Sequence, residues 1–219
     1  MSYAIDLDKI SVSEYETLLK KANLLPGRKI LLKNIASNFA AIRGKGIQSA
    51  GELKRAISTK RKLAAFAVES GIPEEYLVVL RREIGSMEAK DIPLSNFPNI
   101  DEHLLLTLEA KGIRSAKDYL ERVRGTSAEL DALCDLARIN GVGAQAARAF
   151  YEAGYCCSRD VADADAHDML TRVGSVNAEE RYYSARLGEK DMQFCIDSAR
   201  LLVRFENKSG LLTVFDLIQ

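Results

Sequence analysis

The cysteines and histidines are the residues of this sequence best suited to hold a metal ion or to act in catalysis. They are Cys134, Cys156, Cys157, Cys195, His103 and His167. Zinc sites usually pair their ligands at Cys-x2–4-Cys or His-x3–5-His spacing, and neither spacing occurs here. The sequence also lacks a Gly-x-Ser-x-Gly nucleophile motif and the two common glycine-rich phosphate loops. These residues therefore predict a protein without metal, cofactor or catalytic constellation, and not an enzyme.

Asp163 and His167 are the one pair whose spacing could serve a metal ion. They would share a helical face at i,i+4, next to Asp165 and Asp168. The alternative is that these acids lie at the start of a short helix, where a negative charge is favoured. The cysteines are expected to be reduced thiols, because two of them are adjacent in the chain and no secretory signal precedes them.

Charge is distributed unevenly along the chain, although 31 basic and 31 acidic residues cancel overall. Between Arg28 and Lys62 there are ten basic residues and one acidic residue, a local net charge of +9. Residues 1–90 carry a net +6 and residues 91–219 a net −6. A basic segment of this kind favours a polyanion, although a solvated helix face or an acidic protein partner would also explain it. The cations expected to contribute most are Lys54, Arg55, Lys60, Arg61 and Lys62.

Helix signals recur along the chain and indicate an all-α fold. Capping boxes begin at Ser11, Ser49 and Thr126, each with a glutamate three residues later. Gly71 would end a helix over residues 60–70, and Pro73 would open the next one. Strands are conceivable only at residues 3–7 and 211–218.

A boundary between two halves is predicted at residues 90–99, which contain two of the four prolines. We therefore expect a basic N-terminal half, residues 1–90, and an acidic C-terminal half, residues 91–219. The longest stretches without charged residues are nine residues long, for example 92–100, whereas a membrane-spanning helix needs about twenty. A cytoplasmic protein without membrane contact is expected.

One phrase occurs three times, which indicates an internal repeat. Residues 46–53 recur as 112–119 and more loosely as 154–161, at separations of 66 and 42 residues. In each copy an apolar helix precedes the glycine, over residues 35–43, 104–110 and 146–153. The glycine would end that helix in a left-handed turn, and the hydroxyl and carboxylate after it would start another short helix.

Copy three is the fullest, because Gly141 and Gly143 flank an apolar residue immediately before a helix of small residues. Residues 139–143, followed by Ala147, Gly154 and Asp160, resemble a helix-hairpin-helix motif. Together with residues 77–81 and 176–180, the three copies resemble an uncharacterised bacterial family of tandem degenerate helix-hairpin-helix repeats, over roughly residues 15–205. The resemblance implies an all-α fold of tandem helix-hairpin-helix repeats with short connecting helices.

The resemblance also implies that copy three binds a nucleic-acid backbone without reading bases. The phosphate donors would be the backbone N–H groups of Gly143, Ala144 and Gln145, with Arg148 adding a charge and Asn140 completing the turn. In the other copies Asn99 and Asp101, or Lys33 and Ile35, replace Gly141 and Gly143. An aspartate would repel a phosphate. Close packing of two helices would explain the glycines equally well.

Two functions remain open from the sequence. The first is a non-enzymatic, sequence-nonspecific binder of double-stranded DNA or another polyanion. The second is a protein-interaction scaffold or self-associating protein, in which the hairpins serve only packing and the oppositely charged halves recognise a partner or a second copy. Base-excision glycosylase chemistry uses hairpins of this kind, but its lysine hairpin and catalytic aspartate are not matched after Gly154.

Overall fold

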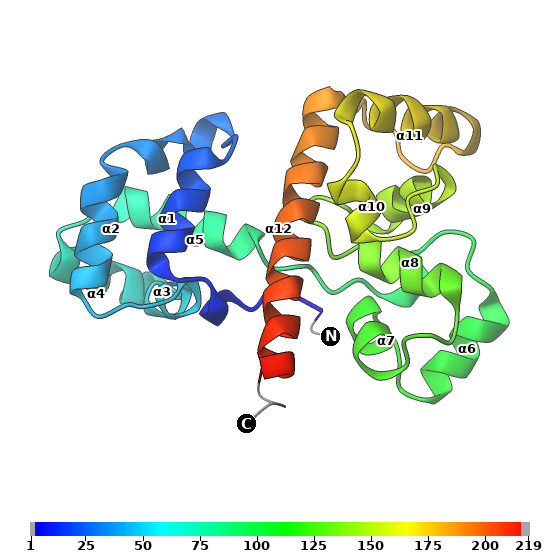
Figure 1. The fold of residues 1–219 in the computed structure, drawn as a ribbon, viewed down its shortest axis with the longest axis horizontal. Helices are drawn as coiled ribbons and strands as arrows, with labels where there is room; N and C mark the ends of the chain where they lie inside the picture. Colours follow the sequence, from blue (N-terminus) through cyan, green and yellow to red (C-terminus); the bar gives the residue numbers. More distant parts are fainter. Residues whose placement is uncertain (1–2, 216–219) are drawn as a thin grey trace. The chain divides into compact units, whose positions relative to one another are not determined.

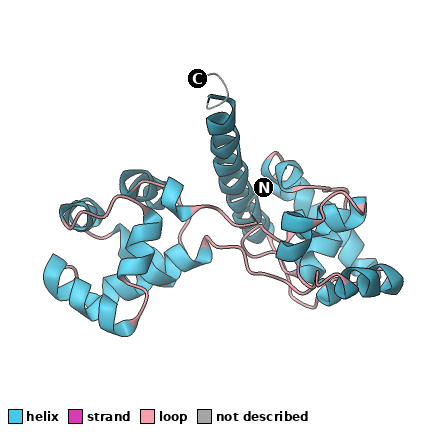
Figure 2. Cartoon of the chain, turned by 90° about the horizontal axis from the view of Figure 1, so that it is seen from below, coloured by secondary structure: helices cyan, strands magenta, loops and turns pink. Residues whose placement is uncertain are grey.

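The computed structural model describes residues 3–215, with side chains as far as residue 206. Within this range the fold is all-α, with helices and two isolated bridges but no strand (Figure 2). The chain forms two compact units: an N-terminal unit, Asp6–Glu88, and a C-terminal unit that contains residues 3–5 and everything described from Ala89 onward (Figure 1). Residues 3–5 therefore belong with the C-terminal unit, whereas the sequence analysis placed them in the N-terminal half.

The N-terminal unit is built from five α-helices and two 3-10 helices. The α-helices are α1 (Val12–Lys21), α2 (Ile35–Gly44), α3 (Ala50–Ala56), α4 (Lys60–Ser70) and α5 (Glu74–Ser86), with η1 (Leu7–Lys9) and η2 (Pro26–Leu32) between or before them. Helix α4 has the predicted bounds and ends at Gly71, whose φ is 71°. The fully buried Phe39, Leu53 and Leu77 bring α2, α3 and α5 into one core.

The C-terminal unit contains the other helices. They are η3 (Leu94–Asn96), α6 (Glu102–Ala110), α7 (Ala116–Arg122), α8 (Ala128–Leu136), α9 (Ala144–Glu152), α10 (Ser158–Ala162), α11 (Ala166–Glu180) and α12 (Glu189–Phe215). Helix α12 lies along α10 and α11 and buries Met192, Ile196 and Ala199 in the same core as α8 and α9. The cap of α8 is Ser127, one residue after the predicted Thr126, because the Thr126 hydroxyl bonds to Tyr119 instead.

The three repeats share one pattern of hydrogen bonds, which confirms the internal repetition. Each repeat glycine has a left-handed backbone, with φ of 78°, 72° and 94° at Gly46, Gly112 and Gly154. Two residues later a backbone N–H donates to the carboxylate that begins the next helix. These pairs are Gln48 with Glu52, Arg114 with Asp118, and Cys156 with Asp160.

The turns before the three repeat helices also resemble one another. We call these turns hairpin one (residues 33–35), hairpin two (97–101) and hairpin three (139–143). Each contains one left-handed residue: Asn34 (φ 54°), Asn99 (57°) and Gly141 (91°). The left-handed residue of hairpin one is therefore Asn34 and not Lys33, the ungapped counterpart of Gly141. Helix α2 begins immediately after Asn34, whereas α9 begins three residues after Gly141.

The two candidate strands do not form where the structure describes them. Residues 3–6 have no strand and Leu7 starts η1, while residues 211–215 are the last turn of α12. The remaining residues of that second candidate, 216–218, lie outside the described range. None of the described helices has the length and apolar character needed to span a membrane.

Candidate nucleic-acid interface

Hairpin three exposes its glycines and buries the apolar residues between and before them. Ile139 and Val142 are buried, whereas Gly141 and Gly143 are exposed and Asn140 is half-buried. Gly143 is the N-cap of α9, and no side chain caps this helix. The first N–H groups of a helix have no acceptor within it, so the positive end of α9 is left uncovered by side chains.

Glycine stands at residues 141 and 143 of hairpin three for different structural reasons. Gly141 has a φ of 91°, and an added Cβ would lie 3.0 Å from Cε1 of Phe194. Gly143 has an ordinary extended backbone, with φ −90° and ψ 179°, and an added Cβ there would meet no atom within 4 Å. Neither backbone conformation nor close packing therefore requires glycine at residue 143. The glycine at residue 143 instead leaves the N-terminus of α9 without a side-chain cap.

The side chain of Arg148, a predicted phosphate-binding charge, is buried and paired within the fold. Its side chain is 3% exposed; Nε donates to the carbonyl of Pro98 at 2.9 Å and Nη1 to Glu129 at 2.5 Å. The small residues of α9 let this helix pack closely, and the face that carries Arg148 is turned into the core. The guanidinium instead fastens hairpin two to α9.

Hairpin two is occupied by internal contacts. The Asp101 carboxylate caps α6 by accepting the N–H of Leu104 at 2.7 Å. The Asn99 side-chain amide donates to the hydroxyl of Tyr182, which donates to Glu152 at 2.7 Å. Burial, and secondly the hydrogen bond to Glu152, raise the pKa of Tyr182 to about 12. This hairpin serves packing, and a carboxylate covers the helix end where a phosphate would bind.

Much of the basic segment is neutralised within its own unit. Lys54 pairs with Glu88, and both terminal nitrogens of Arg55 contact the carboxylate of Asp8, at 3.0 and 2.7 Å. The hydrogen bond from Arg55 holds the pKa of Asp8 below its usual value. Arg28 and Arg43 are similarly paired with glutamates. Lys54 and Arg55, both predicted site residues, therefore offer a polyanion less than their formal charge.

We call Lys60, Arg61 and Lys62 the basic trio. Their position in the helix and their ion pairing distinguish them from Lys54 and Arg55. All three are exposed in the first turn of α4, after the N-cap Thr59. None of the ion pairs between described residues involves them. Cations are disfavoured at a helix N-terminus, so this placement costs local stability that a bound anion would offset.

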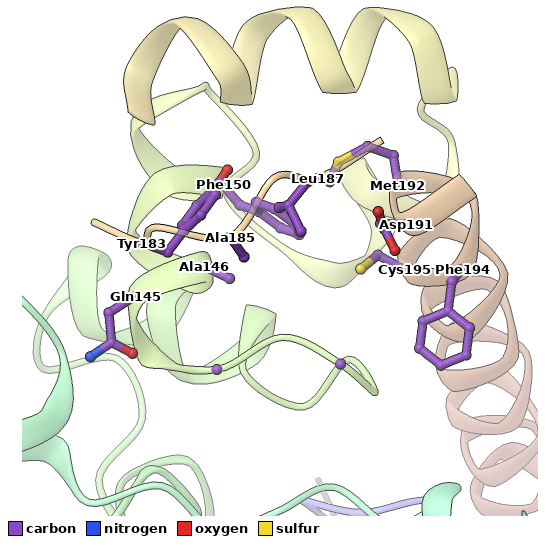
Figure 3. Close-up of a pocket in the computed structure, with 12 residues that line it drawn as sticks. Gln145, Ala146, Phe150, Tyr183, Ala185, Leu187, Asp191, Met192, Phe194 and Cys195 are labelled. Atoms are coloured by element: carbon purple, nitrogen blue, oxygen red, sulfur yellow. The ribbon is translucent and has the colours of Figure 1, made fainter. Parts of the chain in front are cut away.

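Residues 183–187 and the start of α12 form a groove beside hairpin three that the sequence analysis did not predict (Figure 3). Its volume is about 400 Å³. Its lining residues are Gly141, Gly143, Gln145, Ala146, Phe150, Tyr183, Ala185, Leu187, Asp191, Met192, Phe194 and Cys195. The apolar residues at helical spacing in α12 predict a core face and give no sign that Phe194 stays exposed.

Of the acids around His167, Asp165 and Asp168 lie at the start of a helix, as the alternative interpretation holds, whereas Asp163 lies at the end of the preceding one. Asp163 is the C-cap of α10, and Asp165 is the N-cap of α11 and accepts the N–H groups of His167 and Asp168. No cluster of three or more potential metal ligands occurs in the described part of the chain. The four cysteines are free thiols, and burial raises the pKa of Cys195 to about 12.

Comparison with known proteins identifies part of this architecture. A family model described as a SAM-like helix-hairpin-helix tandem matches residues 133–179, which cover hairpin three, α9, α10 and most of α11. No curated protein and no solved structure matches the chain. The protein therefore contains a helix-hairpin-helix tandem in its C-terminal unit, within an all-α helix-hairpin-helix fold.

Proposed function

We propose that this protein binds the phosphate backbone of nucleic acid without sequence specificity and without catalysis. The observation that carries the proposal is the uncapped N-terminus of α9, exposed by Gly143 inside the matched helix-hairpin-helix segment. Helix-hairpin-helix domains are commonly associated with nucleic-acid binding. Backbone N–H groups at a helix N-terminus bind phosphate without contacting a base, so the proposed binding is independent of sequence.

The basic trio of the N-terminal unit is proposed as a second group of phosphate contacts, separate from hairpin three. Hairpin three has no exposed arginine of its own, because Arg148 is buried and paired. Two phosphate contacts alone would give a salt slope of about −2 and weak binding at physiological salt. Three exposed cations in the first turn of α4 would add up to about three further phosphate contacts, and with them a steeper salt dependence.

The first experiment compares Gly143→Asp with Gly143→Asn. Both side chains fit the open space at this position and can cap α9, but only aspartate places a charge there, as Asp101 does in hairpin two. We expect Gly143→Asp to weaken binding of a labelled duplex about tenfold in a low-salt anisotropy titration. Gly143→Asn should weaken it by less. Equal affinities for the parent and both variants would contradict the role of hairpin three.

The second experiment replaces Lys60, Arg61 and Lys62 by glutamine. The salt slope should become shallower by roughly two to three units if the trio contacts phosphates. A control with the same change in net charge replaces the exposed Lys111, Arg114 and Lys117 of copy two. The two triple variants should differ; an identical loss in both would mean that only overall charge matters.

The alternative function is a protein-interaction scaffold, and hairpin two favours it. That hairpin shows that one copy of the repeat has become a packing element, held by Arg148 and Tyr182. If hairpin three also served only packing, affinity capture would recover a protein partner that stays bound after nuclease treatment. Recovery of nucleic acid that is lost on nuclease treatment, without such a partner, would support the proposed function.

A further inference from the structure

The groove beside hairpin three contains an exposed aromatic side chain. Phe194 is 41% exposed, whereas the other large exposed hydrophobic residues in the described part of the chain are aliphatic. Its ring lies beside Gly141, where an added Cβ would be 3.0 Å from Cε1 of Phe194. Phe194 also lines the groove (Figure 3). A phenylalanine with this much exposed surface offers apolar area to a ligand.

The groove combines three chemical properties within one unit. Its walls are largely apolar, with Phe150, Leu187 and Met192 among them. Its rim includes Gly143 and Gln145, at the uncapped positive end of α9. Asp191 also lines it: Oδ2 accepts the N–H of Gly188 at 2.8 Å, which leaves Oδ1 as an acceptor for a ligand.

An occupant that satisfies all three properties has an anionic group, a flat apolar body and hydrogen-bond donors. A nucleotide has this composition: the phosphate suits the helix end, the base face suits Phe194, and base N–H groups suit Asp191. A fatty acid would have no donor for the carboxylate, and an apolar peptide would have no anion for the helix end. The groove volume of about 400 Å³ lies within the range of small-ligand pockets.

We infer that this groove binds one unpaired base of a nucleic acid whose phosphate contacts hairpin three. This inference rests on the proposed function and specifies its ligand: a strand with unpaired nucleotides should bind more tightly than a fully paired duplex. A paired base is stacked inside the helix and cannot present its face to Phe194. Stacking on an aromatic side chain is tolerant of sequence, so the preference would be for unpaired structure and not for one base.

The test uses Phe194→Trp as a reporter, because the chain contains no tryptophan. A mixed-sequence single strand should quench the fluorescence of this single tryptophan. An abasic sugar-phosphate strand of the same length has the same charge and no base, and should quench it little. Equal quenching by the two strands would overturn the inference, as would quenching by an apolar peptide without any by the single strand.

Phe194→Ala measures the energetic contribution of the ring. We expect affinity for the single strand to fall by roughly 5- to 150-fold, and a thermal melt of the variant shows that it is folded. Unchanged single-strand affinity overturns the inference. If Gly143→Asp still weakens duplex binding in that case, the proposed function stands; if the parent protein binds neither ligand, both fail.

Discussion

Hairpins two and three have the same backbone turn but treat the following helix in opposite ways. Each places one left-handed residue, Asn99 or Gly141, two positions before the N-cap of its helix. In hairpin two the N-cap is Asp101, which satisfies the end of α6 with its own carboxylate. In hairpin three the N-cap is Gly143, which offers α9 no side chain. The turn is thus preserved while the helix end changes from capped to open.

The contrast shows that the turn and the phosphate site are separable properties of this repeat. An asparagine is sufficient for the turn, because its side chain tolerates the left-handed region. The availability of the helix end depends on the N-cap residue and on what packs against the hairpin. Arg148 and Tyr182, from outside hairpin two, bind its Pro98 carbonyl and its Asn99 side chain. A degenerate motif can therefore keep its fold after its helix end has become capped.

The largest expected effect on this comparison comes from Arg148→Met. Removing the guanidinium breaks a buried ion pair and leaves the Pro98 carbonyl without its donor. We expect the free energy of unfolding of the C-terminal unit to fall by about 2 kcal/mol, measured by chemical denaturation. Arg114→Ala, which removes an arginine from an exposed pair, should change it by less than about 0.5 kcal/mol. If Arg148→Met left the free energy of unfolding unchanged but abolished nucleic-acid binding, Arg148 would belong to the proposed binding site.

A reciprocal exchange of caps should give a smaller effect. Asp101→Ala removes the cap of α6 and should lower the free energy of unfolding by about 1 kcal/mol. Gly143→Asn gives α9 a cap that it lacks and should raise the free energy of unfolding by a few tenths of a kcal/mol. Thermal denaturation of both variants checks the signs. A destabilising Gly143→Asn would mean that residue 143 needs glycine for its own fold.

The smallest effect is a dependence on alkaline pH through Tyr182, which is bonded to Asn99 of hairpin two. The pKa of Tyr182 is raised to about 12, above the usual 10.0, so the folded state favours the neutral phenol. The stability contributed by this hydroxyl is present below pH 10 and is lost as the pH rises toward 12. Tyr182→Phe should remove one late step from the ultraviolet titration of the tyrosines. If Tyr182→Phe still showed this late step, the step would belong to another tyrosine.

Local sequence signals predicted the helices well where both ends of a helix carry one. The glycine at Gly71 marked the end of α4, and the repeated glycines located the turns before α3, α7 and α10; in the structure Thr59 caps the start of α4. The shift by one residue at Asn34 was missed because the alignment of the copies contained no gap. A left-handed backbone is harder to predict at an asparagine than at a glycine, because asparagine is also common in other conformations.

The candidate site was harder to predict because exposure and pairing depend on distant residues. Arg148 follows hairpin three in the sequence at a spacing that suits a phosphate, yet its partners are Pro98 and Glu129, far away in the chain. Asp8, the partner of Arg55, is likewise 47 residues away. Charge counting along the sequence cannot identify such partners. The groove at Phe194 depends on tertiary packing in the same way.

The most direct measurement is a titration of isotopically labelled protein with a short duplex, followed through the backbone amide resonances. We predict that the signals of Gly143, Ala144 and Gln145 shift progressively as duplex is added. The amide of Leu104, which the Asp101 carboxylate already holds, should remain in place. Shifts in hairpin two equal to those in hairpin three, or no shift in hairpin three under conditions where the duplex binds, would contradict the distinction between an open and a closed hairpin.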